Sequence, residues 1–244
     1  MSLIASRRSI IPACDVSSLA HLARIADGTA HVQGISAYKV GMELVIRFGL
    51  PAPVRIIRSY HPHALIIYDH QKGGNDIPVM GKRFADAVKE AKADAVILFP
   101  FTGPASECAW IKACTEAELA VLVGSHMTHA EFVAEQGGFI PLVQLERVYD
   151  IAVDHGITDF VVPGNQADVV KKYRDRIGKR MGSDAFRLYA PGFVEQGGSI
   201  SEAGEAAGDQ WHAIVGTAIY NHEHTRQILK AAQQLTAEIM RTAH

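Results

Sequence analysis

The sequence predicts a (β/α)8 barrel, in which eight parallel strands form a closed ring and a helix follows each strand. The chain has 244 residues, close to the ~250 residues typical of this fold. Eight short apolar runs alternate with longer amphipathic segments along it, which is the pattern of repeated βα units. No linker rich in Gly, Ser or Pro interrupts the alternation. We therefore expect a single barrel domain over residues 1–244.

The strands are predicted where apolar residues form short runs, because the strands of a parallel sheet are buried on both faces. The third run, Leu65 to Tyr68, is the clearest, since Asp69 follows it at once. The first run also ends in an acid, Asp15, and the second contains Lys39. The predicted strands cover residues 9–15, 36–41, 65–68, 94–100, 120–126, 158–163, 185–191 and 212–216.

The helices are predicted from apolar residues at helical spacing and from capping residues. After the third strand, Phe84, Val88 and Ala91 recur with Lys and Glu between them. Ser17 or Ser18 suits the N-cap of the first helix. A doubly wound open sheet is disfavoured, because no Gly-rich phosphate turn follows the first strand. The predicted helices cover residues 18–27, 42–49, 82–93, 105–117, 141–156, 166–178 and 223–242.

Composition and charge restrict the classes of partner. Hydrophobic residues make up 48% and charged residues 20% of the chain, as in an ordinary globular protein rather than a disordered or membrane chain. A formal net charge of -2 argues against a large nucleic-acid-binding surface. No apolar run approaches the ~18 residues of a membrane span, and the start lacks an export signal. We expect a small-molecule substrate, with neither nucleic acid nor membrane as partner.

The cysteine and histidine residues do not predict a metal site. Cys14, Cys108 and Cys114 are scattered and fit neither a disulfide framework nor a zinc spacing, so we expect reduced thiols and a cytoplasmic protein. Paired histidines are present, but no pair has a convincing third ligand on a neighbouring strand end. These pairs are His61 with His63, His126 with His129, and His222 with His224.

A charge cluster directly follows the third strand, at the end of a barrel that carries the active site. Asp69, Lys72 and Asp76 alternate in sign, with Gly73 and Gly74 between them. Such a cluster would also suit a solvated surface loop. The glycine pair favours a functional loop, because glycine permits backbone conformations closed to other residues and re-aims the side chains beside it.

Two glycine-bearing turns follow the seventh and eighth strands, at residues 191–198 and 215–219. Barrel enzymes often hold a phosphate group between these two loops, with backbone N–H groups as donors. Glycines end many strands, so neither turn is specific alone. Together, in these two places, they predict a phosphorylated ligand.

These residues resemble those of the orotidine 5'-phosphate decarboxylases, cofactor-free barrels whose superfamily also contains hexulose-phosphate synthases and ketogulonate-phosphate decarboxylases. The central pattern of that family is Asp-x-Lys-x-x-Asp, usually followed by Ile and often by Pro. The resemblance runs from the first strand to the last. It is carried by Asp15, Lys39, Asp69, Lys72, Asp76-Ile77-Pro78, Ser125-His126, Pro191-Gly192, Gln196-Gly197-Gly198, Val215-Gly216 and Ala218-Ile219-Tyr220.

The resemblance implies conversion of orotidine 5'-phosphate to UMP in pyrimidine biosynthesis, without metal or cofactor. Lys72 would stabilise the carbanion and protonate it, Asp69 would lie near the departing carboxylate, and Lys39 and Asp76 would hold the charge network.

The resemblance also implies the residues that bind the substrate and a homodimer with shared active sites. Asp76 and Ile77 would reach into the neighbouring subunit's site. Asp15 would bind the ribose hydroxyls and Ser125 the edge of the pyrimidine. The remaining substrate-binding residues, on the phosphate side, are Pro191, Gln196, Gly197, Gly216 and Thr217.

The sequence departs from the family pattern at three places. Lys72 lies three residues after Asp69 and four before Asp76, so each spacing is one residue longer. A strand-end bulge and the two glycines would absorb the extra residues. Met80 replaces a threonine that commonly touches the substrate. Thr217 replaces a phosphate-binding arginine, so either the affinity for phosphate falls or another cation, such as Arg187 or Lys82, substitutes.

Two other functions remain open on the sequence. A related class of barrels uses Mg²⁺ to stabilise an enediolate formed from a sugar phosphate, and Glu43 would be available as a metal ligand. Lys39 in the second strand and the intact Asp76-Ile77-Pro78 favour the nucleotide decarboxylase. The stretched motif and Thr217 would also fit a non-catalytic barrel that binds a phosphate ligand.

Overall fold

The computed structural model describes residues 3–70, 73–193 and 197–241. Within them, eight parallel strands form one sheet in the order β1-β8-β7-β6-β5-β4-β3-β2. The ring closes between β1 and β2, where the Cys14 amide donates to the Lys39 carbonyl at 2.8 Å. The strands are β1 Arg8–Pro12, β2 Ala37–Gly41, β3 Leu65–Asp69, β4 Ala95–Leu98, β5 Ala120–Gly124, β6 Asp159–Val161, β7 Arg187–Pro191 and β8 Trp211–Val215. The predicted barrel is confirmed.

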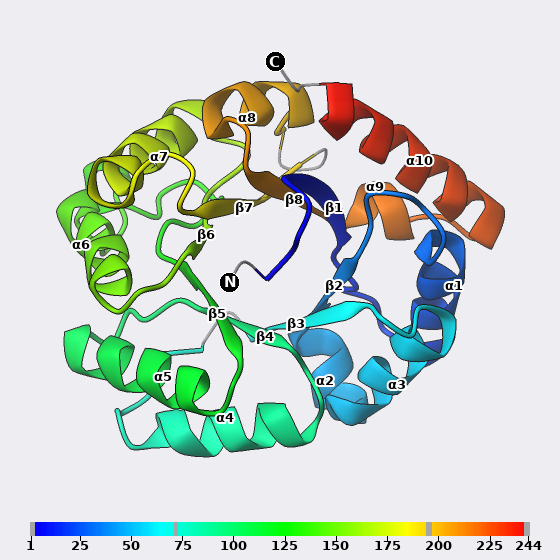
Figure 1. Ribbon diagram of the computed structural model, residues 1–244, viewed down its shortest axis with the longest axis horizontal. Coiled ribbons are helices and arrows are strands. Elements are labelled where there is room, and N and C mark those ends of the chain that lie inside the picture. Colours follow the sequence, from blue (N-terminus) through cyan, green and yellow to red (C-terminus); the bar gives the residue numbers. More distant parts are fainter. Residues whose placement is uncertain (1–2, 71–72, 194–196, 242–244) are drawn as a thin grey trace.

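The helices surround the strands as an outer ring (Figure 1). They are α1 Leu19–Thr29, α2 Met42–Phe48, α3 Pro51–Tyr60, α4 Met80–Glu90, α5 Pro104–Glu116, α6 Leu142–Asp154, α7 Ala167–Met181, α8 Ile200–Ala207, α9 Thr217–Tyr220 and α10 Thr225–Arg241, with a short 3-10 turn at Ala134–Gln136. Every predicted helix is present within a few residues. Helices α3, α8 and α9 were not predicted.

Apolar packing closes the barrel at the amino ends of its strands. The barrel interior is filled by side chains such as Ile11, Ile67, Leu122 and Tyr189, and Ile4 packs into the same cluster with 2% exposure. The chain before β1 crosses this end of the barrel in Figure 1. Among the described residues, a cavity lined by charged groups lies at the opposite end, where the strands finish.

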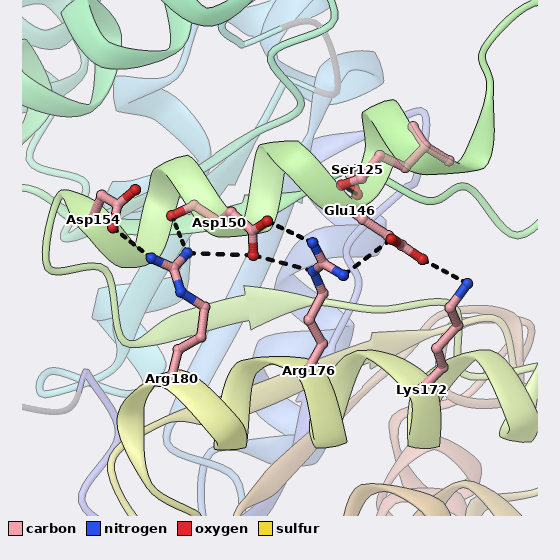
Figure 2. A network of polar contacts seen from close by, with 8 residues as sticks. Ser125, Glu146, Asp150, Asp154, Lys172, Arg176 and Arg180 are labelled. Atoms are coloured by element: carbon pink, nitrogen blue, oxygen red, sulfur yellow. Dashed lines mark hydrogen bonds and ion pairs between the residues drawn. The ribbon is translucent and has the colours of Figure 1, made fainter.

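Helices α6 and α7 are joined by a network of ion pairs (Figure 2). Glu146 binds Lys172 at 2.6 Å and Arg176 at 3.0 Å. Arg176 also binds Asp150 at 2.6 Å, and Arg180 continues the series toward the end of α6. On each helix the charged residues are spaced about one turn apart, and residues three or four apart lie on one side of a helix. The charged side of α6 therefore faces the charged side of α7. The network fixes α7 beside the barrel.

Candidate active site

A cavity of about 210 Å³ lies at the carboxyl ends of the strands. Apolar side chains such as Ile97 and Ile214 form part of its wall, and charged groups stand on one side. A pocket of this kind, with a few converging polar groups, is typical of a small-molecule site. Its lining includes six of the residues predicted from the sequence, Asp15, Lys39, Asp69, Pro191, Gly216 and Thr217.

Three charged groups meet on the β1–β3 side of this cavity. The Lys39 ammonium lies 2.9 Å from Asp15 Oδ2 and 3.0 Å from Asp69 Oδ2. The side chains of Lys39 and Asp69 are each 7% exposed, whereas Asp15 is 42% exposed. Gly41 makes room for this arrangement, because a Cβ at that position would overlap the Asp15 carboxylate.

The two carboxylates keep Lys39 charged. Burial alone would lower its pKa, but the charges of Asp69 and Asp15, together with their hydrogen bonds, raise the pKa above its ordinary value. The ammonium is thus protonated at any pH at which the protein functions. The site combines one fixed cation with a buried carboxylate and a second, half-exposed carboxylate that a ligand can reach.

The loop after β3 lies tightly against β4. The Phe99 amide donates to the Gly73 carbonyl at 2.8 Å, and a Cβ on Gly73 would lie 2.9 Å from the Ile97 carbonyl oxygen. Gly74 has a φ of +86°, a conformation that favours glycine. The glycine pair therefore allows the backbone at Gly73 and Gly74 to lie close to residues 97–100. Lys72 lies outside the described residues.

Asp76 and Ile77 do not line the cavity of their own chain. Helix α5 fixes their backbone, since the Ser106 hydroxyl donates to the Asp76 carbonyl at 2.7 Å and the Trp110 indole N–H to the Ile77 carbonyl at 3.2 Å. Their side chains are exposed, and Ile77 and Val79 are 60% and 67% accessible. An ordered backbone with exposed apolar side chains suits contact with another molecule.

The loops after β7 and β8 form another side of the cavity. Pro191, Gly192, Gly216 and Thr217 line it. Gly197 has a φ of +79° and lies beyond the lining. Gln196 lies outside the described residues. The two glycine-bearing turns thus meet at one cavity, as the sequence predicted.

The two cations considered as substitutes for the missing arginine, Arg187 and Lys82, do not line this cavity. Arg187 is the first residue of β7, so it begins at the amino end of the strand, and one of its guanidinium nitrogens donates to the Phe186 carbonyl at 3.3 Å. Lys82 is 78% exposed on α4 and pairs with Asp86 at 2.8 Å. Neither side chain lines the cavity.

The residues after β5 differ in orientation from what the sequence suggested. Ser125 is fully buried, and its hydroxyl donates to the Leu145 carbonyl at 2.9 Å rather than lining the cavity. The next residue, His126, does line it. Burial, reinforced by the charge of Lys172, lowers the pKa of His126 to about 4, so the imidazole is neutral. From the sequence, His126 was part of the family resemblance and of a histidine pair, and no contact with the substrate was predicted for it.

Side chains that would suit a metal do not converge in the described residues. No group of three His, Cys, Asp or Glu side chains is placed there to hold an ion. Glu43 lies on α2, where Arg47 is 3.5 Å away, and does not line the cavity.

Comparison with known proteins identifies the family. A profile of the Orotidine 5'-phosphate decarboxylase / HUMPS family matches residues 8–232. The orotidine 5'-phosphate decarboxylase of Methanosarcina barkeri is 34% identical over 233 residues, which cover 94% of each chain. That of Pyrococcus abyssi is 31% identical and covers 94% of this chain and 98% of its own.

Solved structures agree. Orotidine 5'-phosphate decarboxylase from Pyrococcus horikoshii superposes with a TM-score of 0.75 and 27% identity, over 95% of this chain and 99% of the other. Orotidine 5'-monophosphate decarboxylase from Methanocaldococcus jannaschii, complexed with the inhibitor BMP, superposes with a TM-score of 0.80 and shares the fold at 20% identity, over 95% of this chain and 98% of the other. The chain therefore belongs to the orotidine 5'-phosphate decarboxylase / HUMPS family.

Proposed function

We propose that this chain is a carboxy-lyase that converts orotidine 5'-phosphate to UMP in pyrimidine biosynthesis, without metal or cofactor. The observation that carries the proposal is the Lys39 ammonium held between Asp15 and Asp69. This group lies at a cavity at the carboxyl ends of the strands, where barrel enzymes have their active sites. The names of the similar proteins support the same reaction. The proposal needs no group beyond the side chains of the chain itself.

The proposed reaction breaks the bond between C6 of the pyrimidine and its carboxylate. Carbon dioxide leaves, and the electron pair stays on C6, which then takes a proton. Asp69 faces the departing carboxylate, and Lys39 fixes Asp69 at 3.0 Å. Lys72 stabilises the carbanion and supplies the proton, and Asp76 completes the charge network. Charges held in place before the reaction stabilise the transition state without the cost of reorganisation.

The same proposal assigns the binding residues. Asp15, the more exposed carboxylate of the cluster, binds ribose hydroxyls. We assign the phosphate to the turns after β7 and β8, against Pro191, Gly216 and Thr217. The resemblance adds Gly197 and Gln196, of which Gln196 lies outside the described residues. Ser125 was predicted to bind the edge of the pyrimidine, and it would have to release the Leu145 carbonyl to do so.

A homodimer with shared sites forms part of the proposal. The exposed Ile77 and Val79, together with Asp76, would enter the neighbouring subunit's site. The three cysteines are free thiols, which suits the cytoplasm that we propose as its location. In the described residues no helix is long and apolar enough to span a membrane.

Orotidine 5'-phosphate added to EDTA-treated protein tests the proposed reaction. We expect the ultraviolet absorbance of the substrate to fall at the same rate with and without EDTA, and Asp69→Asn to abolish the change. Activity on sugar phosphates that appears only when Mg²⁺ is added would instead assign the chain to the metal-dependent class. Binding of UMP without turnover of either substrate would make it a non-catalytic barrel.

A further inference from the structure

A second cavity, of about 240 Å³, lies between the loop after β4 and helices α5 and α6, which are neighbours in the outer ring (Figure 1). It shares no lining residue with the candidate active site. Its volume is below the ~300–1,000 Å³ of pockets for drug-sized ligands, so a ligand that fits it is small. The apolar part of its lining includes Phe101, Phe139, Ile140, Leu145, Val148 and Ile151.

Glu107 places a carboxyl group in this apolar cavity. It lies in the first turn of α5, lines the cavity and is 1% exposed. Its Oε1 atom is buried, and no hydrogen-bond partner for that atom is found in the part of the chain that the structure describes. A buried polar group without a hydrogen bond costs free energy. The helix dipole favours an acid in a first turn, but it does so at exposed positions too and does not explain the burial.

Arg147 brings the opposite charge to the same cavity. It is an exposed residue of α6 and lines the cavity. Its charge acts on Glu107, where it opposes the rise in pKa that burial causes. The two side chains nevertheless form no ion pair with each other, and no described residue forms a hydrogen bond with the Arg147 guanidinium. A ligand in this cavity can therefore pair with a carboxylate and with a guanidinium.

We propose that this second cavity binds an apolar α-amino acid, a small zwitterion with an apolar side chain. The ammonium group of the ligand donates to Glu107 Oε1, its carboxylate accepts from the Arg147 guanidinium, and its side chain packs against the apolar lining. Hydrogen bonds between charged groups are roughly twice as strong as neutral ones, and the ligand supplies the partner that the buried carboxyl lacks. The inference is independent of the proposed function, because the two cavities have separate linings.

Calorimetric titration with L-phenylalanine and L-leucine tests the proposal. We expect at least one of them to bind, with one molecule per chain, and to bind more tightly than the matched amine or acid that lacks one of its charges. These analogues are phenethylamine and 3-phenylpropanoate for phenylalanine, and isopentylamine and 4-methylpentanoate for leucine. Glu107→Gln should weaken binding of the amino acid roughly tenfold to hundredfold, and Arg147→Met by a smaller factor because Arg147 is exposed. The control Glu116→Gln removes an exposed carboxyl that pairs with Lys112 at the other end of α5 and should leave the affinity unchanged.

Several outcomes would overturn the inference, and none of them involves turnover of orotidine 5'-phosphate. One is that Glu107→Gln binds the amino acid as tightly as the unmodified protein, and another is that an analogue with one charge binds as tightly as the zwitterion. If Glu107→Gln fails to fold, Arg147→Met decides, and an unchanged affinity overturns the inference. Absence of binding by both amino acids also overturns it. If Phe139→Ala, which truncates a 99% exposed ring of the lining, then converts a dimer to a monomer in sedimentation, the cavity belongs to a contact between two copies of the chain.

Discussion

At the scale of single residues, the cavity depends on a buried lysine whose charge is balanced by two acids. Removing one partner of a buried ion pair leaves an uncompensated charge, which is far more costly than the pair was worth. Loss of Lys39 would take this ion pair from Asp69, whose side chain is 7% exposed. Asp15 is 42% exposed, and water would compensate it in part.

We predict that Lys39→Met lowers both stability and activity. The free energy of unfolding should fall by ~3 kcal/mol, as for a broken buried pair, and decarboxylation should be lost because Asp69 is no longer held in place. Urea unfolding and turnover measure the two effects. Lys82→Met removes a lysine from an exposed pair on α4. It should change the free energy of unfolding by no more than ~0.5 kcal/mol and leave turnover unchanged. A stable, active Lys39→Met would contradict the assigned network.

The phosphate side offers a second test at this scale. Neither Arg187 nor Lys82 lines the cavity, and Thr217 does. Thr217→Arg should therefore tighten UMP binding by ~1.5–3 kcal/mol, the value of a charge-assisted contact. Uridine, which lacks the phosphate, should bind equally to both forms. Equal UMP affinities would show that the phosphate lies elsewhere or already has a cation.

At the scale of elements, strand positions were more predictable than helices and side-chain directions. The strands are buried on both faces and form apolar runs in the sequence, so the sequence predicted Asp15 and Asp69 at the ends of the first and third strands and Lys39 within the second. Helix α3 was missed because it contains Pro51 and Pro53, which mark a break in a pattern although proline is favoured in the first turn. The directions of Ser125 and His126 depend on α6 and α7, which no local pattern reveals.

Helix α5 supplies a prediction about pH. Glu107 in its first turn is 1% exposed, and burial, opposed only by the charge of Arg147, raises its pKa to about 8. The folded state holds the Glu107 carboxyl best in its protonated form. The free energy of unfolding therefore falls as the pH rises from ~4.5, where the unfolded chain loses this proton, toward 8, where the folded protein loses it. Glu107→Gln should match the original protein at pH 4 and exceed its unfolding free energy by at least ~1 kcal/mol at pH 8. If the unfolding free energies of the two proteins instead change with pH in parallel, Glu107 ionises as readily in the folded protein as in the unfolded chain.

At the scale of the whole molecule, the barrel brings some of the predicted site residues to one cavity and leaves Asp76 and Ile77 outside it. Six predicted residues line one cavity, because parallel strands bring their carboxyl ends together whatever the sequence of the intervening helices. Asp76 and Ile77 follow the same strand as Asp69, yet they lie outside that cavity with their backbone bound to α5. The spacing of the motif does not show that Asp69 lines this cavity whereas Asp76 does not.

This division predicts complementation between inactive variants. Lys72→Ala and Asp76→Ala should each lack activity, because the first removes the proposed proton donor and the second the residue that we propose to enter the neighbouring subunit's site. If sites are shared, a mixed dimer contains one site with both residues intact, so random exchange should restore up to about a quarter of the activity per site. Turnover after subunit exchange, verified with differently tagged chains, measures this recovery.

Mixing Lys72→Ala with Lys39→Met is the control and should restore nothing. Both residues belong to one chain's half of the site, so every mixed site then lacks one of them. Absence of recovery in the first mixture, with exchange verified, would place Asp76 in the site of its own chain and require the loop after β3 to turn inward when the substrate binds.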